Sequence, residues 1–154
     1  MRQESGRSMV EMLGVLAIMG LITVGAVTMI STAMRSQKRS TVSDEVAQIV
    51  TGVRQLLAEY DDFSNINNTT IWGAIGMSQK NPYGGNYALA ANPSNSRQFV
   101  LTINGLSKSD CEYFTAKAWS DTVGYQISDG KKGGASGVCT SDNGTNVVTL
   151  VYGE

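Results

Sequence analysis

The sequence contains no histidine and, among its 154 residues, only two prolines and two cysteines. Without histidine the chain lacks the commonest general base and metal ligand, so Ser-His and Cys-His catalytic pairs are excluded. Lysine and arginine total 12 against 13 acidic residues, which is not the basic excess of a dedicated nucleic-acid surface. The chain also has no phosphate loop, zinc spacing or nucleophile elbow. A buried carboxylate pair stays open, although nothing marks one. We therefore expect no enzyme activity, cofactor, metal or nucleic-acid partner.

Apolar residues make up 42% of the chain, enough for the core of one domain, and many of them lie near the N-terminus. An apolar run extends from Met9 to Ile30 and contains a single acid, Glu11. The segment 12–34 carries no charge, and as a helix it would be about 34 Å long, enough to cross a bilayer. A carboxylate inside such a segment is costly in lipid, so Glu11 is a candidate functional residue.

The next segment changes from uniformly apolar to amphipathic. A short basic neck of Arg35, Lys38 and Arg39 is expected to form a solvated helix face near lipid headgroups. Beyond the neck, apolar residues recur at helical spacing: Val42, Val46, Ile49, Val50, Val53, Leu57 and Tyr60. No proline occurs before Pro82, so we expect one continuous helix of about fifty residues, from Ser8 to Tyr60. Its first half needs lipid or other protein around it, and its second half needs a globular domain.

The pattern of the rest of the chain predicts short strands, turns and one helix. We expect strands over 86–90, 98–103, 124–127 and 146–152, turns at 81–85 and 92–95, and loops at 61–70 and 131–134. A helix over 110–119 can be capped by Ser107 or Ser109, and 70–77 suits a short helical turn. The stretch 142–146 lacks the full spacing of a calcium loop, so a hairpin turn explains it better.

The residues from Gly6 to Gly20, GRSMVEMLGVLAIMG, resemble the class III signal of type IV pilins and related secretion pseudopilins. In that family a polar leader ends in glycine, and a prepilin peptidase cuts after it. The new N-terminal amine is methylated, and the fifth residue is a glutamate. The resemblance implies cleavage between Gly6 and Arg7, N-methylation of Arg7 and an assembly role for Glu11. Arg7 stands where the family usually has Phe, Met or Leu.

A second block, from Asn81 to Cys111, resembles the type IVb pilins through its Pro-aromatic-Gly-Gly turn, its alternating strand and the GLSKSDC approach to a helix. The resemblance implies an α+β fold, in which a long N-terminal helix packs against a small antiparallel sheet with one disulfide. It also implies four parts. These are a leader (1–6), an apolar assembly half of the helix (7–34), an amphipathic half (35–60) and a globular head (61–154).

Cys111 and Cys139 are most simply a disulfide if the domain is exported, and the resemblance implies the same pairing; two buried free thiols are the alternative. Charges on both sides of the apolar run leave its orientation open. A disulfide indicates that the head lies outside the cytoplasm and the N-terminus inside. The protein would then cross the inner membrane once before joining an extracellular pilus.

The function implied is structural, as a type IV pilus subunit serving adhesion, aggregation or motility. The expected partners are copies of the same chain in a helical filament, the inner membrane, prepilin peptidase and the assembly machinery. Glu11 would pair with the N-terminal amine of a neighbouring copy and so select one stagger between subunits. The alternatives are a minor pilin or type II secretion pseudopilin and, in a different class, a monomeric signal-anchored binding module or enzyme.

Overall fold

The computed structural model describes residues 4–58, 60, 62–128, 138–140 and 143–154, and the chain divides into two compact units, 1–38 and 39–154. The elements in chain order are α1 (Glu4–Leu56), α2 (Ile71–Ile75), β1 (Tyr87–Asn92), β2 (Asn95–Leu106), α3 (Lys108–Ala116), β3 (Thr122–Ser128) and β4 (Asn146–Gly153). The loop predicted at 131–134 and part of the hairpin turn predicted at 142–146 lie outside the described residues.

Helix α1 is continuous over 53 residues, as the absence of proline predicted, but it is shifted toward the N-terminus. It begins at Glu4, inside the expected leader, and ends at Leu56, four residues before the predicted end. The backbone turns after Leu56, where the amide of Tyr60 donates to the carbonyl of Leu57 at 3.0 Å. The Asp62 carboxylate then accepts from the amide of Ser64 at 3.1 Å, an Asx turn that competes with helix continuation.

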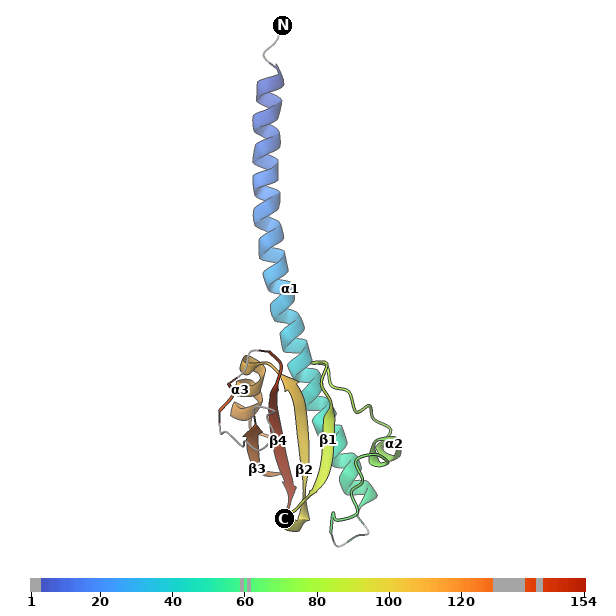
Figure 1. Cartoon of the computed structure of the whole chain (residues 1–154). Coiled ribbons are helices and arrows are strands. Elements are labelled where there is room, and N and C mark those ends of the chain that lie inside the picture. The colour runs from blue at the N-terminus through green and yellow to red at the C-terminus, as the bar shows by residue number, and fades with distance from the viewer. Residues whose placement is uncertain (1–3, 59, 61, 129–137, 141–142) are drawn as a thin grey trace. The chain divides into compact units, whose positions relative to one another are not determined.

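From here on, the head means the whole unit 39–154, which includes the second half of α1 besides the predicted head of 61–154. It is built on a four-stranded antiparallel sheet in the order β1-β2-β4-β3 (Figure 1). All four predicted strands are present, and β2 is longer at both ends than the alternation indicated. Pro93 and Ser94 form the turn between β1 and β2. The strand latest in the sequence, β4, lies in the interior of the sheet between β2 and β3.

One face of this sheet forms the core together with the second half of α1. Alternate strand residues are buried: Tyr87, Leu89, Phe99, Leu101, Ile103, Val148, Leu150 and Tyr152. The helix contributes its predicted stripe, of which Val42, Val46, Ile49, Val50 and Val53 are buried in the same cluster. The burial of each such side chain stabilises the folded state by roughly 1.5–3 kcal/mol. The prediction is wrong for Tyr60, which is 57% exposed because the helix has already ended.

The two short helices test the predicted helical turn at 70–77 and the predicted helix over 110–119, whose cap was left open. Helix α2 occupies the predicted helical turn and ends at Gly76, whose φ of 69° suits glycine. Helix α3 is capped by Ser107, not Ser109, because the Ser107 hydroxyl accepts from the amide of Asp110 at 3.3 Å. It ends at Ala116, before the predicted Trp119, whose indole instead donates to the carbonyl of Phe114 at 2.8 Å.

Candidate functional site

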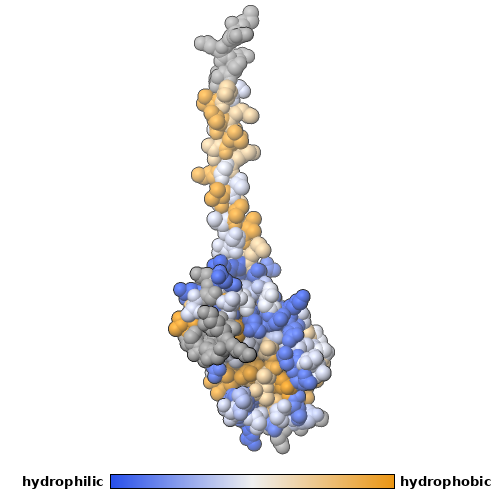
Figure 2. Space-filling view, in the orientation of Figure 1, coloured by the Kyte–Doolittle hydropathy of each residue, from blue (hydrophilic) through white to orange (hydrophobic). Residues whose placement is uncertain are grey.

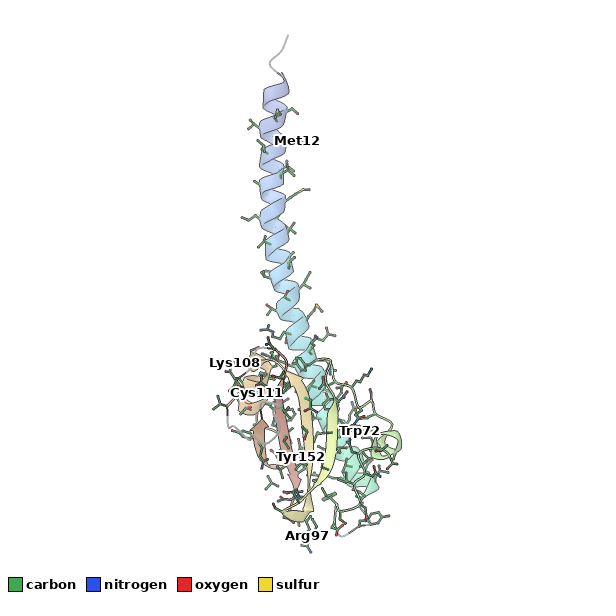
Figure 3. The ribbon with its side chains drawn as sticks, viewed as in Figure 1. Met12, Trp72, Arg97, Lys108, Cys111 and Tyr152 are labelled. Carbon is green, nitrogen blue, oxygen red and sulfur yellow. A yellow bond between two sulfur atoms is a disulfide. The ribbon has the colours of Figure 1, made fainter. Side chains whose placement is uncertain are left out.

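The side chains of the apolar stretch of α1 are exposed, and those on the visible side can be followed in Figures 2 and 3. Every large apolar residue from Met9 to Met34 is at least 53% exposed, and Leu21 reaches 80%. Within the described part of the chain, one helix, Ser8–Leu56, is long and apolar enough to cross a membrane by length and composition. Apolar surface of this extent is unfavourable in water, so lipid or other protein must cover it.

The predicted assembly residues lie on this helix. Glu11 is exposed within the apolar stretch. Gly6 and Arg7 belong to the backbone of α1, but their side chains lie outside the part of the chain that is described. Cleavage after Gly6, methylation of Arg7 and the pairing of Glu11 therefore stay predictions.

The predicted disulfide is present in the head. Cys111 on α3 (Figure 3) is joined to Cys139 with their Cα atoms 5.9 Å apart, and both residues are buried. The segment after the disulfide is tied to the sheet by Asn146, whose side chain accepts from the amide of Thr140 at 3.1 Å. The same side chain donates to the carbonyl of Leu106 at 3.1 Å. The disulfide therefore anchors α3 to the segment that leads into β4.

The basic neck differs from its prediction at Arg39. Arg35 and Lys38 are exposed, as a solvated face requires. Arg39 instead contacts α3. Its Nε lies 2.8 Å from the Asp110 carboxylate, which is only 6% exposed, and its guanidinium donates to the carbonyl of Ser109 at 3.2 Å. The guanidinium also lies over the ring of Tyr113, 4.5 Å from the centroid. The prediction is wrong here because spacing along a helix cannot reveal a partner seventy residues away.

Other polar side chains of the head hold its loops in place, and no role was predicted for them. Asn68 accepts from the indole of Trp72 at 3.1 Å and from the amide of Leu89 at 2.8 Å, so it joins α2 to β1. Asn81 donates to the carbonyl of Asn104 at 2.7 Å and accepts from the amide of Gly85 at 3.0 Å. The only available signal was an asparagine at the start of a turn, which is typical of Asx turns in general.

Glu45, on the second half of α1, accepts a hydrogen bond of 2.5 Å from the hydroxyl of the buried Tyr87. Burial raises the pKa of Tyr87, and the Glu45 carboxylate raises it further. Burial likewise raises the pKa of Tyr83 and of Tyr152 to about 12. These phenols therefore stay neutral at physiological pH and act as core residues.

The head carries an open groove of about 720 Å³ lined by Arg54, Tyr60, Phe63, Arg97, Asp121, Thr122, Gly153 and Glu154. Arg54 and Asp121 form an exposed ion pair at 3.2 Å across it. No cluster of three or more His, Cys, Asp or Glu side chains that could hold a metal occurs in the described ranges. The groove therefore combines side chains of both charge signs with the aromatic rings of Tyr60 and Phe63.

Comparison with known proteins agrees with this arrangement. No protein-family model matches the chain. The chain is 24% identical over 124 residues to the toxin coregulated pilin of Vibrio cholerae serotype O1. The match covers 71% of this chain and 55% of that protein, so the chain spans little more than half the length of this relative. The distant similarity and the long apolar helix fit a pilin subunit.

The similarity supports the pilin family indicated by Gly6–Gly20 and Asn81–Cys111. The pilin-like fold expected from that resemblance, a long helix with an antiparallel sheet and one disulfide, is the fold observed. The similarity also favours a structural, non-enzymatic role and fits a protein held in a membrane and later presented on a surface pilus.

Proposed function

We propose that this protein is the major subunit of a type IVb-like pilus filament, and that it polymerises through the apolar stretch of α1. The observation that carries the proposal is the exposure of every large apolar side chain from Met9 to Met34 beside a single acid, Glu11. A helix of this kind needs covering on all sides. Lipid covers it before assembly, and helices of other copies cover it in the filament.

Glu11 determines which neighbouring helices replace the lipid around the apolar stretch of α1. A move from lipid to a bundle of apolar helices exchanges one apolar environment for another, so the hydrophobic effect alone does not select a partner. After prepilin peptidase removes residues 1–6, Arg7 carries the new α-amine, a basic group that can bear a positive charge. Two charges in an apolar bundle are tolerable when paired and costly when alone. Pairing Glu11 with the amine of a neighbouring copy therefore favours one axial stagger.

The head forms the outer part of the filament. Its disulfide fits an oxidising compartment, which agrees with a cytoplasmic N-terminus and an exported head. A repeated head-to-tail contact that does not close into a ring generates a fibre. Adhesion, aggregation or motility then depends on the filament, and the assembly machinery supplies the energy.

The decisive experiment is N-terminal mass spectrometry of filaments sheared from the native bacterium. We expect the protein to be the most abundant filament component, to begin at Arg7 and to carry one added methyl group. A strain without the peptidase should retain residues 1–6 and make no filaments. A small share of the filament mass would instead identify a minor pilin or pseudopilin. An intact Met1 and no polymer would identify a monomeric anchored protein.

A further inference from the structure

The dipeptide Asn-Gly occurs twice in the chain, at Asn104–Gly105 and at Asn143–Gly144. In this dipeptide the asparagine side chain is open to attack by the next backbone nitrogen, because glycine places no side chain in the way. The two copies have different surroundings in the head. Asn104–Gly105 is part of β2, whereas Asn143–Gly144 precedes β4. The same chemical step can therefore be compared in two places of one fold.

The step is a substitution at the side-chain amide. The backbone nitrogen of the glycine bonds to the asparagine Cγ and loses its proton, and ammonia leaves, so that a succinimide ring forms. Water then adds to one of the two ring carbonyls and breaks its bond to the ring nitrogen, which gives aspartate or isoaspartate. Water is the only other reactant. The nitrogen must come within about 3–3.5 Å of Cγ, so the asparagine must turn about its Cα–C and Cα–Cβ bonds.

Asn104 is held by hydrogen bonds on both sides. Its amide donates to the carbonyl of Asn86 at 3.0 Å, and its carbonyl accepts from the side chain of Asn81 at 2.7 Å. Gly105 packs so closely on Gly85 that a β-carbon on Gly105 would lie 2.9 Å from the Gly85 Cα. A turn about the Cα–C bond of Asn104 would move its carbonyl and the Gly105 amide out of these contacts. The fold therefore opposes the rotation that the reaction needs.

Asn143 lies in the bend before β4, and its side chain is exposed to water. Strand β4 begins at Asn146, so both Asn143 and Gly144 lie outside the hydrogen-bond ladder of the sheet. A turn about the Cα–C bond of Asn143 consequently breaks no sheet hydrogen bond. The same dipeptide is thus accessible to the reaction here.

The start of β4 is fixed independently of the side chain at position 143. Asn146 is fully buried and donates to the carbonyl of Leu106 at 3.1 Å. It also accepts from the amide of Thr140 at 3.1 Å. A new carboxylate at the exposed position 143 remains in water, where a charge is tolerated. We therefore expect the product to stay folded.

We propose that Asn143 is a site of spontaneous deamidation in the folded protein, whereas Asn104 is protected from the same reaction by its place in β2. Each event adds one negative charge to a chain whose formal net charge is −1. The modified fraction rises with time after synthesis, since no step of the reaction restores the amide. The charge of the head surface at this bend thus depends on the age of the molecule.

The test follows both asparagines by peptide mass spectrometry in purified full-length protein, kept in detergent and heavy-oxygen water at mildly alkaline pH. Trypsin cuts after Lys108 and so places Asn104 and Asn143 on different peptides. Deamidation during the incubation adds about 3 Da, whereas deamidation during a digest in ordinary water adds about 1 Da. We expect Asn143 to be converted at least tenfold faster than Asn104, because a displacement of ~1 Å from the reacting geometry costs about 100-fold.

Three controls accompany this measurement. In urea the two asparagines should react at similar rates, because the fold no longer distinguishes them. Asn143→Gln keeps the amide but lengthens the side chain, and should show no conversion at position 143. Asn143→Asp carries the charge of the product and should keep the urea midpoint of the parent.

Similar rates for the two asparagines in the folded protein would overturn the proposal. So would an Asn143 that is converted only in urea, or a lowered urea midpoint of Asn143→Asp. None of these results depends on filament assembly, so they leave the proposed subunit function to its own experiment.

Discussion

The two halves of α1 have similar apolar side chains and opposite surroundings. Ile22 is 63% exposed, whereas Ile49, on the same continuous helix, is fully buried. The difference lies in pattern: the first half is apolar all round, and the second is apolar along one stripe that matches the sheet. The head therefore contains the partners of its own stretch of helix, while the apolar side chains of the first half are exposed.

Removal of Glu11, the one acid of the first half, should have the largest effect. We expect Glu11→Ala to lower filament yield at least tenfold, because no charge remains to pair with the neighbouring amine, while membrane insertion is unchanged. Immunoblots of sheared and membrane fractions measure both. Thr23→Ala, which removes an uncharged side chain whose hydroxyl donates to the carbonyl of Met19, is the matched control. Normal filament yield from Glu11→Ala refutes the role of the acid.

The head should depend strongly on its disulfide. A Cys111→Ser, Cys139→Ser double variant is expected to lower the free energy of unfolding by about 3.5 kcal/mol, because the bond closes a long loop in the unfolded chain. Urea unfolding in detergent, followed by tryptophan fluorescence, measures this. Both tryptophans, Trp72 and Trp119, lie in the head. An unchanged urea midpoint contradicts a stabilising bond.

A matched pair of substitutions tests directly whether the stability of the head depends on both halves of α1. Ile49→Ala leaves a cavity in the core and should cost about 3 kcal/mol of head stability. Ile22→Ala should leave the urea midpoint of the head unchanged, because Ile22 is 63% exposed and is not a member of the core cluster. Equal effects of the two substitutions on tryptophan-detected unfolding would show that the halves are not independent.

The two ion pairs of the head should contribute different amounts to its stability, because they differ in burial. Arg39→Ala leaves the nearly buried Asp110 without its guanidinium partner, and we expect a loss of about 2 kcal/mol. Arg54→Ala breaks the exposed pair with Asp121 and should cost under ~1 kcal/mol. The same urea assay compares them. A larger loss for Arg54 would reverse the order that burial predicts.

The smallest expected effect is a loss of stability at alkaline pH. Tyr83 and Tyr152 have pKa values raised from 10.0 to about 12, chiefly by burial. Because the folded pKa exceeds the unfolded one, their contribution to stability is complete below pH 10 and is lost as pH rises toward 12. Thermal unfolding at constant salt should show the melting temperature falling across that window. In a Tyr152→Phe variant the melting temperature should decrease less across the same pH window.

Periodicity and turn chemistry predicted the elements because both are local. The stripe from Val42 to Val53, the alternation of Phe99 to Ile103 and the serine before α3 each identify an element without knowledge of the rest. The cap alternatives Ser107 and Ser109 could not be separated, since both precede the same turn. The Arg39–Asp110 pair and the bonds of Asn68 could not be found either, because they join elements brought together only by folding.

The position of β4 has a consequence for biosynthesis. The ribosome makes β3 before β4, yet in the sheet β3 pairs only with β4. The hairpin of β1 and β2 can form early, but β3 has no strand to join until residues 146–153 emerge. Completion of the sheet is therefore delayed until β4 has been synthesised, because the edge strand β3 can join the sheet only through β4.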